Sequence, residues 1–189
     1  MELLDIVDIN GKPTGQVIER EEAHRTGALH RTSHVWIVRC HHQEIQVLLQ
    51  KRSDNKDSFP GCYDISSAGH IPAGVDFIPS ALRELKEELG YEANEKDLIY
   101  CGYHTFESKH YFHGQLFHNY QYSNIYMLYA DIDISKLVLQ VEEVSAVVWM
   151  NLDECIEGVK NNTLQHCIHL DELELIRDKY QQVFVDENK

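Results

Sequence analysis

Three glutamates stand at helical spacing near the middle of the chain, where together they could bind a metal ion. Glu84, Glu87 and Glu88 lie within one turn of each other if residues 79–89 form a helix. At separations of roughly 5–6 Å, three carboxylates repel one another unless a cation lies among them. Oxygen ligands suit a hard divalent cation, so the cluster predicts a Mg²⁺ site, with Mn²⁺ as a substitute. The alternative interpretation is an acidic helix face that is simply solvated.

An apolar stripe supports the helix that would carry these glutamates. Apolar side chains recur at steps of three and four residues, at Ile78, Leu82, Leu85 and Leu89. This stripe must face a core, and we expect the glutamates on the opposite side of the helix, which ends before Gly90. Arg83 precedes Glu87 by four residues, a spacing at which it could pair with a carboxylate and set its orientation.

The order of residues over positions 69–91 resembles the signature of the Nudix hydrolases. A glycine, Gly69, is followed after a spacer by the residues RELKEELGY at positions 83–91. The resemblance implies a loop–helix–loop that binds divalent metal and hydrolyses a diphosphate bond in a nucleoside diphosphate derivative or a related small molecule. It also implies that Glu87 and Glu88 are metal ligands, that Glu84 is a further ligand or a base, and that Arg83 orients them.

One position departs from that signature. The family pattern has a glutamate six residues after its first glycine, whereas this chain has Val75 there, with Asp76 beside it. Either Asp76 takes over through a small backbone shift, or the site has lost a contributor to metal binding. The second case would favour a catalytically weakened sensor or binding module with the Nudix fold, which is the alternative to an active hydrolase.

Similarity beyond the signature is to the branch of the superfamily that includes isopentenyl-diphosphate isomerase. Four segments carry it, at residues 30–37, 50–53, 59–61 and 65–70. The resemblance implies that His24, His30 and His70 could hold a second metal ion; ordinary hydrogen bonding is the alternative for these histidines. An isomerase would also need a cysteine where Ala68 stands and glutamates in the segment 122–126, which has none. We therefore expect a shared scaffold with hydrolase chemistry.

Basic residues near the signature are the candidates for substrate binding. Lys51 and Arg52 end a predicted strand and could contact phosphates, although exposed basic residues are equally common at such a place. His70, beside the first glycine of the signature, is a third candidate. The general base stays open, because Glu84 and three acids outside the helix are all candidates, namely Glu107, Glu142 and Glu143.

Residues 103–120 are crowded with aromatic and histidine side chains. These rings could stack on a base, form the packed side of a hairpin, or make the contact of a homodimer. The sequence leaves the three interpretations open, and with them the identity of the substrate and the oligomeric state.

Composition limits the kinds of partner. The chain has 189 residues with 17 Lys and Arg against 31 Asp and Glu, a formal charge of −14, which argues against binding a nucleic-acid backbone. A small phosphorylated substrate would also be repelled unless metal ions neutralise it. The five cysteines are scattered without metal-like spacing, which suits a reducing cytoplasm. No signal peptide or membrane-spanning stretch is recognisable, so we expect a cytoplasmic protein without a membrane partner.

The surrounding elements predict an α/β fold. Strands are expected at 3–9 and 16–19 as a hairpin, and at 30–40, 45–52, 63–66, 98–112, 120–132 and 144–150. Helical patterns cover 21–25, 79–89, 152–160 and 170–185. Strands on both sides of the acidic helix favour a mixed sheet between helices, the α/β/α sandwich that the Nudix resemblance also implies. We expect a single domain over residues 1–189, which includes the N-terminal hairpin 3–19 and the C-terminal helix at about 170–185.

Overall fold

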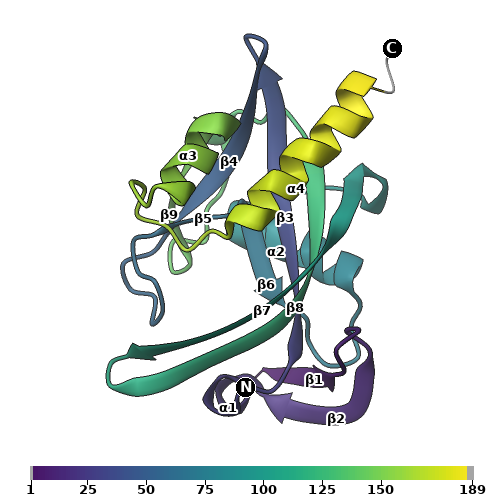
Figure 1. Ribbon diagram of the computed structural model, residues 1–189, viewed down its shortest axis with the longest axis vertical. Helices are drawn as coiled ribbons and strands as arrows, with labels where there is room; N and C mark the ends of the chain where they lie inside the picture. Colours follow the sequence, from purple (N-terminus) through teal and green to yellow (C-terminus); the bar gives the residue numbers. More distant parts are fainter. Residues whose placement is uncertain (1, 187–189) are drawn as a thin grey trace.

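A mixed seven-stranded sheet forms the centre of the computed structural model, which describes residues 2–186 (Figure 1). Its strands run in the order β5-β4-β3-β8-β7, with β6 added beside β3 and β9 beside β4. Strands β3 and β8 are parallel, and the other pairs are antiparallel. The strand bounds are β3 His30–His41, β4 Glu44–Arg52, β5 Tyr63–Asp64, β6 Ser67–His70, β7 Leu98–Phe112, β8 Gln115–Tyr129 and β9 Val144–Asn151.

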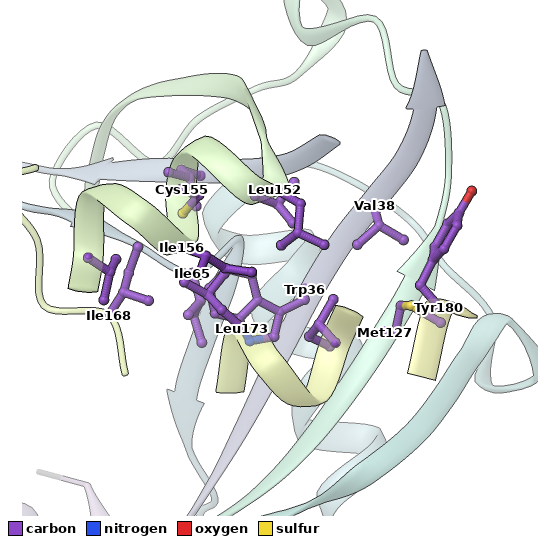
Figure 2. Packing of buried hydrophobic residues seen from close by; sticks show 14 of the residues in the cluster. Trp36, Val38, Ile65, Met127, Leu152, Cys155, Ile156, Ile168, Leu173 and Tyr180 are labelled. Atoms are coloured by element: carbon purple, nitrogen blue, oxygen red, sulfur yellow. The ribbon is translucent and has the colours of Figure 1, made fainter. Parts of the chain in front are cut away.

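Helices cover both faces of this sheet. Helix α2 (Phe77–Leu89) lies on one face, and α3 (Leu152–Lys160) and α4 (Leu170–Tyr180) lie on the other (Figure 1). Alternate residues of β3 serve the two cores: Val35 and Ile37 pack in the cluster under α2, whereas Trp36 and Val38 pack under α3 and α4 (Figure 2). The predicted α/β/α sandwich with a mixed sheet is therefore confirmed.

The N-terminal segment forms the expected hairpin. Strands β1 (Leu3–Val7) and β2 (Pro13–Glu19) pair with each other, and α1 (Arg20–Thr26) follows as a slightly longer helix than predicted. Strand β1 is tied to the main sheet by a buried ion pair, since Arg31 Nη2 lies 3.0 Å from Asp5 Oδ2. Asp5 Oδ2 also accepts a hydrogen bond from the backbone N–H of Gly74, 2.9 Å away. The hairpin thus supports the loop that leads into α2.

Helix α2 differs from the prediction at its start and on its buried face. It begins at Phe77 rather than at residue 79, because the Asp76 side chain accepts a hydrogen bond from the Phe77 N–H and caps the helix. It ends at Leu89, before Gly90 with its positive φ of 65°. Glu88 lies on the buried side with Leu85 and Leu89, so its expected place opposite the apolar stripe is wrong.

The region 113–119 is not the connection that the sequence suggested. Strand β8 begins at Gln115 rather than at residue 120, and it ends at Tyr129 rather than at 132. Only His113 and Gly114, with φ of 50° and 76°, turn the chain, as in a tight hairpin turn. Strands β7 and β8 form a long hairpin that projects beyond the rest of the sheet (Figure 1). In this hairpin His110 lies opposite Phe117, and Lys109 lies opposite His118, so the ring-rich region is paired strand rather than a loop.

Two other elements have bounds that differ from the prediction. The predicted strand 63–66 is shortened to β5, which ends at Asp64, and a separate strand that was not predicted, β6, begins at Ser67 and pairs with β3. The predicted helix 170–185 ends as α4 at Tyr180 and continues as a π-helical turn, Gln181–Asp186. Over residues 2–186, none of the helices has the length and apolar character that crossing a membrane requires.

Candidate active site

A pocket of about 970 Å³ opens between α2, the half of the β7–β8 hairpin nearest its turn, and the start of α4. All three glutamates of the acidic cluster, Glu84, Glu87 and Glu88, line it. Strand β6 lies beside them and contributes Ala68, Gly69 and His70 to the lining. Other parts of the wall carry both rings and cations, including Arg20, Arg52, Lys56, Phe59, Phe106, His110 and Phe117.

Glu84 and Glu87 are both held by Arg83. The Arg83 Nη2 atom lies 2.5 Å from Glu84 Oε1, and Nη1 lies 3.6 Å from Glu87 Oε2. Arg83 also donates a hydrogen bond to the carbonyl of His70, 3.2 Å away, which ties α2 to β6. The pairing that the helical spacing predicted is therefore present, and it restricts the orientation of both carboxylates.

Gly69 leaves room for the Glu84 carboxylate. A Cβ atom built on Gly69 would lie 2.2 Å from Glu84 Cδ and from Oε1, a distance that no side chain tolerates. The glycine is needed here for close approach rather than for an unusual backbone angle.

Glu88 is buried and accepts hydrogen bonds from two donors. Its Oε2 atom accepts from Ser67 Oγ at 2.7 Å and from the Ala68 N–H at 3.3 Å. Burial raises the pKa of Glu88 to about 8 and that of Glu84 to about 7, because desolvation disfavours a charged carboxylate. A nearby cation would reverse this effect, and carboxylate oxygens are the donors that Mg²⁺ and Mn²⁺ accept. The donor set on α2 therefore fits a divalent metal ion.

Asp76 does not replace the glutamate that the family pattern has at position 75. Its carboxylate caps α2, and neither Val75 nor Asp76 lines the pocket. The Val75 carbonyl accepts a hydrogen bond from Arg31 at 2.9 Å, so the backbone at this position is held in place. The Asp76 carboxylate is therefore engaged at the start of α2, away from the pocket lining.

The three candidate histidines come together from three elements. One ring nitrogen from each of His24 in α1, His30 in β3 and His70 in β6 lies within 4.8 Å of the others. His24 Nε2 and His70 Nε2 are 3.2 Å apart. His30 Nδ1 donates to the Ala28 carbonyl at 2.8 Å, and its buried Nε2 has no hydrogen-bond partner within residues 2–186. Burial lowers the pKa of all three, that of His24 to about 3, so each ring is neutral and can donate a lone pair.

The two basic residues proposed to bind substrate, Arg52 and Lys51, differ in whether they reach the pocket. Arg52 lines the pocket, but its guanidinium is engaged by Asp64 Oδ2 at 3.0 Å and by the Ser58 carbonyl at 2.9 Å. Lys51 does not line the pocket, so its predicted role in substrate binding is not supported. The two residues are neighbours in β4, where successive side chains point to opposite faces of the sheet.

Only one of the three acids proposed outside the helix reaches the pocket. Glu143 lines it and forms an ion pair with Lys56. Glu107 is paired with His118, 2.7 Å away, and neither Glu107 nor Glu142 is among the lining residues.

Sequence analysis missed a buried charged pair in the pocket. Glu172 in α4 lies 3.0 Å from His34 Nδ1 and also accepts a hydrogen bond from Trp36 Nε1 at 3.2 Å. Both His34 and Glu172 line the pocket. The spacing of Glu172, Ile176 and Tyr180 by four residues places the glutamate on the buried stripe of α4, a pattern that could have identified it.

Comparisons with known proteins agree on the family. A family model described as the NUDIX domain matches residues 28–168. Nudix hydrolase 3 of Arabidopsis thaliana is 41% identical over 159 residues, which are 81% of this chain and 20% of that protein. The chain thus spans about a fifth of that relative's length. An uncharacterised Nudix hydrolase of Clostridium acetobutylicum is 35% identical over 160 residues, which are 85% of this chain and 75% of that protein.

The similarity to a solved structure is low in sequence identity, and the similarity to an isomerase covers less than half of the chain. A crystal structure from Deinococcus radiodurans superimposes with a TM-score of 0.64 at 20% identity, covering 95% of this chain and 99% of that one, which supports the fold alone. The isopentenyl-diphosphate Delta-isomerase of Pectobacterium atrosepticum is 39% identical over 85 residues, 45% of each protein. The similarity to the isomerase branch is therefore partial.

Proposed function

Because the chain belongs to the Nudix hydrolase family, we propose that it hydrolyses a diphosphate bond in a nucleoside diphosphate derivative or a related small molecule. The observation that carries this proposal is the presence of Glu84, Glu87 and Glu88 in the wall of one pocket, with Arg83 bridging two of them. Glu84, Glu87, Glu88 and Arg83 are the proposed catalytic group.

Mg²⁺, or Mn²⁺ in its place, would be held by the three glutamates. When bound, such an ion offsets the charge of a diphosphate and lowers the pKa of a water molecule that attacks phosphorus. The chain's own residues position these carboxylates: Arg83 holds Glu84, and Ser67 holds Glu88. Loss of one carboxylate should therefore affect catalysis more than folding.

The other pocket residues support a substrate that combines negative charge with a ring. Arg20, Arg52 and Lys56 place cationic groups in the pocket wall, each of them paired with a carboxylate that a phosphorylated substrate would have to compete with. Phe59 contacts His110 edge to face with ring centroids 5.1 Å apart, and Phe117 also lines the pocket. Aromatic faces of this kind stack on nucleobases, which favours nucleoside derivatives over plain diphosphates.

We also propose a second metal ion at His24, His30 and His70. Three neutral imidazoles that converge within 4.8 Å suit a borderline transition ion such as Zn²⁺. The buried Nε2 of His30 has no hydrogen-bond partner in the described part of the chain, which supports this proposal, because a metal ion would satisfy it. His70 lines the pocket, so an ion there would add positive charge for a phosphorylated substrate.

A binding module without catalysis is the second candidate. It is favoured by one observation, which is that Asp76 caps α2 and leaves the departure at Val75 without compensation. Isomerase chemistry has no comparable support, because Ala68 lies in the pocket beside Glu88 and carries no titratable group.

A substrate panel tests the hydrolase proposal. Purified protein is incubated with dinucleotides, nucleotide sugars and nucleoside triphosphates, with Mg²⁺, Mn²⁺ or EDTA, and release of phosphate or nucleoside monophosphate is measured. We expect turnover of at least one nucleoside diphosphate derivative that EDTA abolishes. Saturable binding of a panel member without product would instead favour the binding module. Interconversion of isopentenyl and dimethylallyl diphosphate would overturn both.

We propose that the N-terminal hairpin and the C-terminal helix belong to the same domain as residues 28–168. Leu4 of β1 and Leu173 of α4 are fully buried. The expected behaviour is one cooperative unfolding transition by both far-UV circular dichroism and tryptophan fluorescence; two separated transitions would contradict a single domain.

A further inference from the structure

A third group of possible metal ligands, separate from the α2 glutamates and from the cluster of His24, His30 and His70, borders the pocket at the start of α4. It contains His104 of β7, His169 just before α4, and Asp171 in the first turn of α4. One donor atom from each residue lies within 4.8 Å of the other two. The cluster therefore joins the β7–β8 hairpin to the start of α4, two elements far apart in sequence.

The two histidines are held in place by packing rather than by alternative hydrogen bonds. Their rings stack with centroids 5.0 Å apart, and the His169 ring also packs on Phe106 at 4.0 Å. His169 stands at the N-cap position of α4 but makes no capping hydrogen bond with its side chain. The His104 side chain is 14% exposed, and its buried Nε2 has no hydrogen-bond partner among the described residues.

The charges of the cluster suit a cation. The Asp171 carboxylate is paired with His104 Nδ1 and brings a negative charge to the two rings. The neighbouring carboxylate of Glu172 is engaged by His34 and Trp36, so it is not a spare ligand.

We propose that His104, His169 and Asp171 form a binding site for a divalent transition-metal ion, with Zn²⁺ as the best-suited ion. Two imidazoles and one carboxylate are a ligand set that such ions accept, whereas Mg²⁺ prefers oxygen donors alone. Three protein ligands leave at least one coordination position for water or an anionic oxygen. His169 also lines the pocket, so the proposed site adjoins the pocket wall. The inference does not depend on hydrolysis.

The test is the Zn²⁺ content of the full-length protein. Protein stripped with a chelator is dialysed against micromolar Zn²⁺ with excess Mg²⁺, which occupies the carboxylates of α2, and bound zinc is measured by mass spectrometry. His24→Gln is used as the background, because it disables the other histidine cluster. In this background we expect one equivalent of zinc, and we expect that His169→Gln and Asp171→Asn each abolish it. His41→Gln, an exposed histidine at the end of β3, is the matched control and should retain the zinc.

A second readout covers the case in which a variant folds poorly. The Asp171 side chain is 61% exposed, so Asp171→Asn should leave the circular dichroism spectrum unchanged. Zn²⁺ should raise the melting temperature of the His24→Gln protein and should not raise that of the His24→Gln/Asp171→Asn protein. Equal zinc content and equal melting shifts in these two proteins would overturn the proposal, and would leave His104 and Asp171 as an ordinary ion pair.

Discussion

At the scale of single residues, the Glu84 carboxylate lies so close to Gly69 that a side chain at position 69 would displace it. We predict that Gly69→Ala lowers the metal-dependent rate by about tenfold or more, because the new methyl group displaces the Glu84 carboxylate, which would lie 2.2 Å away. The measurement is the steady-state rate as a function of Mg²⁺ concentration.

Gly74→Ala is the matched control for that substitution. A Cβ at Gly74 would meet nothing within 4 Å, although the φ of 77° makes the variant less stable by about 1 kcal/mol. This control should keep the wild-type rate. A folded Gly69→Ala protein with the wild-type rate and Mg²⁺ requirement would show that the position of Glu84 does not matter.

The buried pair of His34 and Glu172 predicts a pH dependence. Burial acts to lower the pKa of His34, but the facing Glu172 carboxylate outweighs it and raises that pKa above the ordinary value of 6.5. The folded protein thus holds this proton more tightly than the unfolded chain. The stabilisation is fully present below about pH 6.5 and is lost as the pH rises through the folded-state pKa of His34.

NMR titration of the histidine rings measures this directly. His34 should stay protonated to a higher pH than His24, His30 and His70, whose pKa values burial lowers. Glu172→Gln removes the charge that raises the pKa, so His34 should then titrate at lower pH. A pKa of 6.5 or less for His34 in the wild-type protein would contradict the assignment of a charged pair.

At the scale of elements, substitutions at the start of helix α2 can test the capping role of Asp76 separately from metal-dependent catalysis. We predict that Asp76→Asn leaves both the free energy of unfolding and the Mg²⁺ requirement unchanged, because asparagine caps a helix as well as aspartate does. Asp76→Ala should lower the free energy of unfolding by about 1 kcal/mol and still keep the Mg²⁺ requirement. Urea unfolding and Mg²⁺ titration of the rate check the two parts. A weaker response of Asp76→Asn to Mg²⁺ would mean that Asp76 had become a metal ligand after all.

The elements themselves were predictable where local pattern and tertiary packing agree. The apolar spacing around Leu85 predicted α2, and β-branched residues predicted the central strands. The helix start was placed two residues late because the Asp76 cap was not recognised, and the hairpin turn at His113 and Gly114 was hidden among aromatic residues that pair across the strands. Both errors concern a turn or a helix cap, and the spacing of apolar residues contains no information about either.

At the scale of the whole molecule, sequence analysis predicted the parts of the site that a short motif contains. Glu84, Glu87 and Glu88 lie within about one turn of one helix, so their closeness follows from helical spacing, although the burial of Glu88 does not. The convergence of His24, His30 and His70 was expected only from family resemblance, and the structure brings the three together. Glu172 was missed and Lys51 was misplaced, because the fold decides which distant side chains reach the pocket and which face of a strand they occupy.

The whole account depends on the carboxylates of α2 acting with a metal ion, and Glu88→Gln tests that claim most directly. Glu92→Gln is the matched control, since Glu92 is exposed just beyond the helix, outside the pocket lining, and pairs with Lys86. The measurement is the Mg²⁺-dependent rate of both folded variants on the best substrate of the panel. We predict a fall of about 100-fold or more for Glu88→Gln, on the usual scale for losing a charge-stabilising group, and the wild-type rate for Glu92→Gln. A folded Glu88→Gln protein that hydrolyses the substrate at the wild-type rate would contradict the account.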